Sequence, residues 1–148
     1  TAIQLWIARN FPEANLLPTE PWAELKAIST MSWCSSGIHP YLSRINSPPK
    51  VCDLADTDDN VTRLAKEYLT ETFHIAHDML AGQNYFFGNF MAPDAHFFWC
   101  CRRATQFNMD LEEFPNVAAH FERMKGRASV QQLLGFEKEV FDKFATAA

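Results

Sequence analysis

Apolar residues recur along the chain with the three- and four-residue spacing of amphipathic helices. The apolar segment at residues 2–10 predicts a short helix that ends before Phe11-Pro12. The stretch Thr19-Glu20-Pro21 is typical of a helix start, because proline is favoured in a first helical turn. From there to Ile45 the apolar positions follow a 4-3-4-4-3 spacing on one face of a long helix: Ala27, Met31, Cys34, Ile38, Leu42 and Ile45.

A second long helix is predicted between the turn Ser47-Pro48-Pro49 and Gly82. The stretch Asp56-Thr57-Asp58-Asp59 marks its start, and Gly82 is a typical residue just beyond a helix end. Its apolar stripe consists of Val61, Leu64, Ala65, Tyr68, Leu69, Thr72, Ile75, Ala76 and Met79.

The segment Ala95–Cys101 is apolar almost all round, which predicts a buried central helix. Residues 117–124 mark another helix, residues 130–134 a short one, and residues 136–144 a last amphipathic one. Alternating β-branched residues are scarce, so little room is left for strands. The pattern therefore predicts an all-α helical bundle around one hydrophobic central helix.

Composition and charge agree with a globular bundle and argue against several classes of partner. The 148 residues are 47% hydrophobic and 14% aromatic, which indicates a packed core and not a disordered chain. A net charge of −5 without charge blocks argues against nucleic acid and anionic membranes as partners. No apolar run approaches the ~20 residues of a membrane span, and the first residues lack the basic start of a signal peptide. The cysteines form no C-x-x-C pair and are expected to be buried, reduced thiols of a cytoplasmic protein: Cys34, Cys52, Cys100 and Cys101.

A polar stripe on the first long helix is the leading candidate for chemistry. Hydroxyl and imidazole side chains recur there within about a quarter of the helix circumference. Trp33 flanks this stripe, and small polar groups beside an aromatic ring suit the wall of a ligand cleft. They suit a close contact between helices or subunits equally well, so the pattern leaves both interpretations open. The stripe consists of Ser29, Ser32, Ser36, His39 and Ser43.

Three other groupings give weaker functional predictions. His74 and His77 could hold a metal, but they lie opposite the predicted apolar stripe, so a solvated polar face is expected. Adjacent Cys100-Cys101 side chains point about 100° apart, which favours two small buried residues over a redox pair. Arg102-Arg103 could bind an anion, cap carbonyl groups or pair with the acids at positions 110–113. The chain contains no G-x-S-x-G motif, phosphate-binding glycine loop or complete catalytic triad.

Longer motifs resemble the C-terminal domain of cytosolic glutathione transferases. Residues 88–98, GNFMAPDAHFF, resemble the start of that domain's central helix, where the family has Gly and then Ser/Thr-x-x-Asp before an apolar run. Residues 114–124, FPNVAAHFERM, followed by RASVQ at 127–131, are similar to the family's closing signature. Residues 32–40, SWCSSGIHP, are similar to the bacterial, beta-like branch, in which a histidine of this helix reaches the cleft. The likeness extends over essentially the whole chain.

Several positions depart from the family pattern. Met91 stands where the family has a hydroxyl N-cap, so Asp94 alone is expected to accept from backbone N–H groups at the helix start. Ala128 replaces the usual proline of the last helix. Arg103 stands where bacterial relatives often have tryptophan, so an altered co-substrate pocket is expected. Pro40 follows the cleft histidine, removes a backbone donor and is expected to kink the long helix.

The resemblance also implies a domain organisation. The apolar start Ala2–Ile7 has no helix-start signal before it except Thr1. Residues 1–12 match the last helix of a thioredoxin-like domain, residues 13–20 a linker, and residues 21–148 the C-terminal helical domain. In this family the thioredoxin-like domain binds glutathione and supplies the residue that activates its thiol. We therefore expect most of that domain to be missing and this chain alone to be inactive, with no catalytic residue of its own.

For the full-length enzyme, the resemblance implies conjugation of glutathione thiolate to electrophilic, largely apolar co-substrates in a cytoplasmic homodimer. Glutathione is then a co-substrate, no cofactor or metal is expected, and neither nucleic acid nor a membrane is an expected partner. The alternatives are a non-catalytic protein-interaction module of the same fold and, third, a free-standing metal or redox bundle. The expected cleft residues, with Ser32 nearest the partner subunit's glutathione, are His39, Ser36, Ser32, Trp33 and Arg103.

Overall fold

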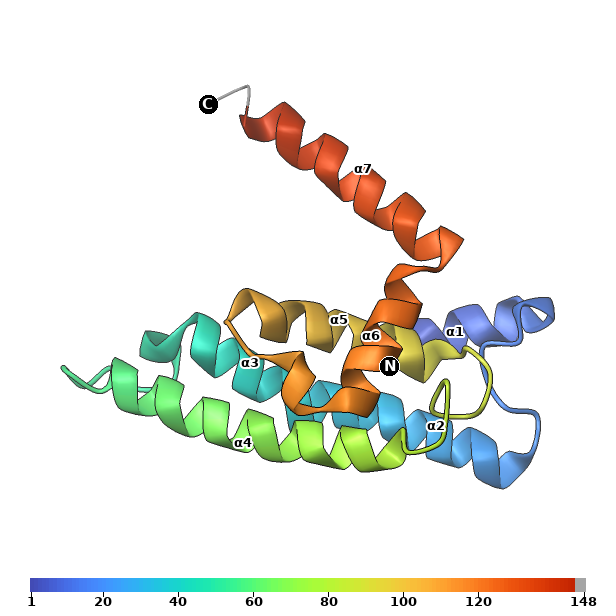
Figure 1. The fold of residues 1–148 in the computed structure, drawn as a ribbon, viewed down its shortest axis with the longest axis horizontal. Coiled ribbons are helices and arrows are strands. Elements are labelled where there is room, and N and C mark those ends of the chain that lie inside the picture. Colours follow the sequence, from blue (N-terminus) through green and yellow to red (C-terminus); the bar gives the residue numbers. More distant parts are fainter. Residues whose placement is uncertain (146–148) are drawn as a thin grey trace.

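The computed structural model describes residues 1–145, and all of the regular elements found there are helical. In Figure 1, α2, α3 and α4 lie along one side of a bundle, α5 and α6 pack over them, and α7 leaves it at an angle. This arrangement confirms the predicted all-α fold class. The helices are α1 (Ala2–Asn10), α2 (Pro21–Trp33), α3 (His39–Asn46), α4 (Asp58–Met79), α5 (Ala92–Gln106), α6 (Pro115–Lys125) and α7 (Ala128–Ala145).

The predicted first long helix is present, but its hydrogen-bonding pattern changes in the middle. α2 begins at Pro21, as predicted, and a π-helical segment, Cys34–Ile38, joins it to α3. In this segment the His39 N–H donates to the Cys34 carbonyl, five residues back. Pro40 accounts for the change, because it has no N–H for the Ser36 carbonyl and its ring would collide with that carbonyl in a regular helix. The distortion expected at Pro40 therefore takes the form of a widened turn just before it.

α4 covers the predicted segment, but its buried face is rotated relative to the predicted stripe. Leu64, Tyr68, Ile75 and Met79 belong to the stripe, yet 38–50% of each is exposed. α4 carries more apolar side chains than one core face can cover, and periodicity cannot show which of them are covered. The side chains that pack into the core are Ala65, Leu69, Thr72, Phe73, Ala76 and, just after the helix, Leu80.

The rotation changes the surroundings of the two histidines of α4. His77 is half-buried, its Nδ1 accepts from the Asn116 N–H at 3.3 Å, and its carbonyl accepts from the Asn116 side chain at 2.9 Å. His74 is exposed and meets the Phe114 ring edge-on, with ring centroids 4.9 Å apart. The expected solvated face is therefore wrong for His77, which helps to hold the start of α6 against α4.

α5 is the central helix of the bundle, but one of its faces is open. Phe97 and Ala104 are fully buried because α2, α3 and α6 pack around them. Ala95 and Trp99 lie on the open face, where 40% of Trp99 is exposed. The prediction of burial almost all round is wrong for this face, because α7 diverges from it instead of covering it.

Three of the four cysteines are buried, and all four are free thiols. The Cys34 pKa is raised, chiefly by a hydrogen bond with the Cys100 thiol, and burial raises the pKa of Cys101. These thiols are therefore protonated and unreactive at neutral pH. Cys52, in the loop before α4, is only half-buried, so the expectation of burial is wrong there. A hydrogen bond from Thr57 lowers its pKa.

A buried carboxylate holds the start of α5. Asp94 Oδ2 accepts from the Met91 N–H at 2.9 Å, and Oδ1 accepts from the Phe86 N–H at 3.1 Å. Oδ1 also lies 3.0 Å from Nε2 of His120, and neither of these two side chains is exposed. Both Asp94 oxygens already accept from backbone N–H groups, so this contact is a hydrogen bond in the tautomer whose Nε2 is the donor. Asp94 thus joins the start of α5, the loop before it and α6.

The end of the chain forms one helix where two were predicted. α7 runs without a break through Gly135, whose presence inside a helix costs only about 1 kcal/mol. Figure 1 shows that α7 extends away from the bundle. Phe136, Phe141 and Phe144 on it are 63–73% exposed. Within residues 1–145, no helix has the length and apolarity needed to cross a bilayer.

Candidate functional site

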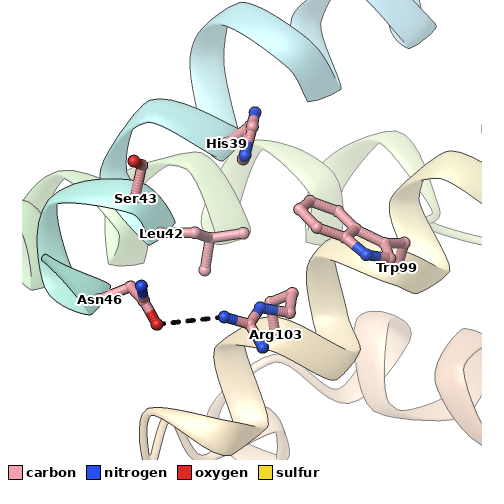
Figure 2. A pocket seen from close by; sticks show the side chains of 6 residues that line it. All are labelled: His39, Leu42, Ser43, Asn46, Trp99 and Arg103. Carbon is pink, nitrogen blue, oxygen red and sulfur yellow. Dashed lines mark hydrogen bonds between the residues drawn. The ribbon is translucent and has the colours of Figure 1, made fainter.

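A cavity of about 290 Å³ lies between α3 and the open face of α5. His39 stands at its rim as the first residue of α3, directly after the π-helical segment. Its ring meets the Trp99 indole edge-on, with ring centroids 5.2 Å apart. Figure 2 shows the α3 side chains on one side of this hollow and the α5 side chains on the other. We call it the first chamber, and its lining residues are His39, Leu42, Ser43, Asn46, Trp99 and Arg103.

Arg103 brings a positive charge into the first chamber. Its Nη2 donates to Asn46 Oδ1 at 3.2 Å, as Figure 2 shows, and its Nη1 donates to Gln106 Oε1 at 2.5 Å. Its guanidinium carbon lies 5.2 Å from the centroid of the Phe107 ring. Within residues 1–145, no carboxylate forms an ion pair with Arg103. Neutral amides therefore hold the guanidinium in place and leave its charge uncompensated.

A second chamber of about 340 Å³ lies on the other side of the same α5 ridge, against α7. Trp99 and Arg103, one helical turn apart, line both chambers, so the two are neighbours on the open face of α5. The second chamber is more apolar, since three aromatic rings reach it. Its lining residues are Trp99, Arg102, Arg103, Gln106, Phe136, Glu137, Val140 and Phe141.

An ion pair connects α7 to α5 beside the second chamber. The Arg102 guanidinium donates to both carboxylate oxygens of Glu137, at 3.2 and 2.5 Å. This two-pronged contact lowers the pKa of Glu137 below its ordinary value. The charges of Arg102 and Glu137 cancel, so Arg103 is left as the net charge of this part of the groove.

The structure brings together only part of the set expected from the sequence. His39 and Arg103 share the first chamber, where Ser43 from the polar stripe joins them. Ser32 and Ser36 are exposed but line neither chamber, and the Ser36 hydroxyl donates to the Ser32 carbonyl at 2.9 Å. Trp33 is half-buried and stacks on Phe97 in the core, with ring centroids 6.3 Å apart.

Several residues of this region were not singled out from the sequence. Trp99 belongs to the run Ala95–Cys101, for which burial is predicted, although Trp99 and Arg103 have the four-residue spacing of one helix face. No sequence motif marks Asn46 or Phe136 as a binding residue. They reach the chambers only because α3 and α7 pack near α5 in the folded chain. His96 is half-buried on α5; burial lowers its pKa, and its Nδ1 has no hydrogen-bond partner within residues 1–145.

The two chambers offer groups for binding. The imidazole of His39 and the guanidinium of Arg103 supply hydrogen bonds, and Trp99 supplies an aromatic surface between them. Each chamber is close in size to the small-molecule sites of proteins, which begin at about 300 Å³. In the part of the chain that the structure describes, no group of three or more metal-ligating side chains gathers.

Comparison with known proteins relates this helical fold to bacterial enzymes. No family model matches the chain. A curated relative, glutathione S-transferase GstA of Escherichia coli O157:H7, is 24% identical over 138 residues, which are 92% of this chain and 65% of the relative. The chain is also similar to the ternary complex of BphK, a bacterial glutathione transferase, with a TM-score of 0.81 and 21% identity over 93% of this chain and 66% of that one. A Sulfitobacter glutathione transferase homologue with bound glutathione matches with a TM-score of 0.82 and 20% identity, over 89% of this chain and 64% of the other.

The chain thus spans about two thirds of the length of each of these proteins. The match covers the bundle, so the resemblance noted in the sequence is confirmed for the fold. The sequence relative and the structural neighbours are glutathione transferases, and the chain has the fold of their all-helical C-terminal domain.

Proposed function

We propose that this chain is the helical part of a glutathione transferase that joins glutathione thiolate to electrophilic, largely apolar co-substrates. The observation that carries the proposal is the bundle's match, over most of its length, to bacterial transferases, one of them with bound glutathione. The open groove on α5 supports it, because His39, Trp99 and Arg103 present binding groups there. We propose that the protein is located in the cytoplasm. We propose that it uses no cofactor or metal and has neither nucleic acid nor a membrane as a partner.

The first chamber is the proposed co-substrate side of the cleft. His39 is proposed to hydrogen-bond the reacting pair, and Arg103 to border the co-substrate. Ser36 and Ser32 extend along the same exposed helix face, and Ser32 is proposed to approach the partner subunit's glutathione in a homodimer. Trp33 is proposed to support this face from behind, since it packs against the core.

The thiol-activating residue is proposed to come from a thioredoxin-like domain, to which α1 would belong, and the linker is proposed at residues 13–20. The surface of α1 supports this assignment, because Ile3, Trp6 and Phe11 are 48–75% exposed and would suit a covering domain. We propose that the 148-residue chain alone has no transferase activity.

The decisive experiment measures conjugation of glutathione to a generic aryl halide by the full-length gene product, after its intact mass has been measured. Turnover supports the transferase. Normal glutathione binding without turnover of any electrophile contradicts it and favours the alternative, a non-catalytic interaction module. The 148-residue chain, assayed in parallel, is expected to show no turnover.

A matched pair of histidine variants tests the cleft. In the full-length enzyme, His39→Ala is expected to lower kcat or raise KM for the electrophile at least several-fold. His74→Ala is the control, because His74 is exposed on α4 and contacts Phe114 away from both chambers. Equal kinetics for the two variants would mean that the polar stripe is only a packing contact.

The homodimer has a test of its own. The exposed stripe of Leu64, Tyr68, Ile75 and Met79 on α4 is the proposed contact surface, since a second copy would remove it from water. Light scattering is expected to give the mass of a dimer for the wild type and the mass of a monomer for Ile75→Glu. A monomeric wild type at high concentration would overturn this assignment.

A further inference from the structure

We propose that the two chambers form one groove selective for aromatic co-substrates that carry a carboxylate, and that Arg103 is the residue that selects them. For the reaction itself, this inference rests on the proposed transferase function. The binding preference follows from the groove alone and can be measured without turnover.

The first argument is the charge distribution along the groove. Arg102 and Glu137 neutralise each other through their two-pronged contact. Arg103 donates to the neutral amides of Asn46 and Gln106 and lies over the uncharged Phe107 ring. Within residues 1–145 it has no ion-pair partner, so its positive charge faces the chambers uncompensated. The net charge of the whole chain is −5, so the positive charge of Arg103 is opposite in sign to that of the protein as a whole. Such a site attracts an anionic group and holds it in place.

The second argument is the number of donors left on the guanidinium. Arginine has five N–H donors in a fixed plane, and two of them serve Asn46 and Gln106 here. The remaining donors suit the two oxygens of a carboxylate, because planar guanidinium groups bind carboxylates in pairs of parallel hydrogen bonds. The amide partners fix the orientation of the Arg103 fork in advance, so less rotational freedom is lost on binding.

The third argument is the aromatic surface beside this cation. Trp99 lines both chambers with Arg103, and Phe136 and Phe141 line the second chamber from α7. These three side chains are 40–71% exposed, which leaves ring surface available to a ligand. A flat aromatic acid would place its ring against these side chains and its carboxylate on Arg103. An uncharged aromatic molecule would gain only the first contact.

The experiment compares two probes of similar shape, 2-naphthoate and the uncharged 2-naphthylmethanol, by calorimetric titration of the purified protein. Wild-type protein is expected to bind the carboxylate about tenfold more tightly, the size of one charge-assisted pair. Arg103→Gln is expected to bring the ratio close to one, and Arg103→Lys to restore part of it. Arg63→Gln is the matched control, because Arg63 is an exposed α4 cation paired with Glu67, and its ratio should stay at the wild-type value.

The inference is overturned by equal affinity of the wild type for both probes, by an unchanged ratio in Arg103→Gln, or by an equal loss of preference in Arg63→Gln. Glutathione also carries carboxylates, so the titration is repeated on the full-length protein with saturating glutathione. Retained naphthoate binding supports a co-substrate groove, whereas mutual exclusion would overturn it. If a variant fails to fold, the ratio of the wild-type affinities for 2-naphthoate and 2-naphthylmethanol still tests the inference.

Turnover separates this inference from the proposed function. Substrate preference is measured as kcat/KM of the wild type relative to Arg103→Gln, for one aryl halide that bears a carboxylate and one that does not. Selective loss with the carboxylate-bearing substrate supports both proposals. Turnover without that selectivity overturns only the inference, and carboxylate-selective binding without any turnover overturns only the transferase.

Discussion

Replacing Asp94 would leave several buried hydrogen-bond donors without an acceptor. Its carboxylate accepts from the backbone N–H groups of Met91 and Phe86 and from Nε2 of His120, and the side chain has no exposed surface. Each buried donor left unpaired costs about 1–3 kcal/mol. Asp94→Ala is therefore expected to lower the free energy of unfolding by at least about 3 kcal/mol, a large part of the 5–15 kcal/mol that is typical of a domain.

Asp94→Asn is the more informative change, because it keeps the volume of the side chain and one acceptor oxygen. The amide nitrogen then faces an N–H donor in place of one carboxylate oxygen. The free energy of unfolding should therefore fall by about 2 kcal/mol. Urea unfolding followed by circular dichroism measures this loss. With a slope of about 1–3 kcal/mol per molar urea, the midpoint should fall by roughly 1 M.

The control is Asp110→Asn, since Asp110 is exposed and, within residues 1–145, accepts from the Glu112 N–H alone, at the short turn Leu111–Glu113. Asparagine caps a helix about as well as aspartate, so the expected change is close to zero. Equal midpoint shifts for Asp94→Asn and Asp110→Asn would refute the reasoning. A double-mutant cycle with His120→Phe should give a coupling energy of about 1 kcal/mol between Asp94 and His120.

Two further predictions follow from glycine packing and from the α5–α7 ion pair. A Cβ on Gly37 would lie 2.6 Å from Cδ1 of Trp33, so Gly37→Ala should destabilise the chain by about 1–3 kcal/mol. Gly135→Ala should instead stabilise α7 by about 0.5–1 kcal/mol, because a Cβ there meets no heavy atom within 4 Å. Urea midpoints of the Gly37→Ala and Gly135→Ala variants that shift in the same direction would contradict this pair of predictions. The lowered pKa of Glu137 means that its contact with Arg102 stabilises the chain above the ordinary value of 4.5 and is lost as pH falls through the lower folded value. Tryptophan fluorescence should show this acid transition in the wild type and not in Glu137→Gln.

The placement of the helices could be predicted from the sequence because their signals are local. Pro21 begins α2, Ser47-Pro48-Pro49 follows the end of α3, and the three- and four-residue spacing of apolar positions predicted the α4 segment. Pro40 announced a distortion in the same way, since the missing N–H and the steric bulk of its ring act within one turn. The motifs around Asp94 also carried the resemblance that the fold confirms.

The tertiary structure alone decided which helix faces are covered and which side chains meet. Periodicity describes one helix at a time, so it could not show that Trp99 lies on an open face or that Phe73 replaces Ile75 in the core. His120 pairs with Asp94 across 26 positions of sequence, and the groove joins side chains of α3, α5 and α7. Such contacts depend on how separate helices pack against one another, and that packing is fixed by the whole bundle and not by the spacing of residues along any single helix.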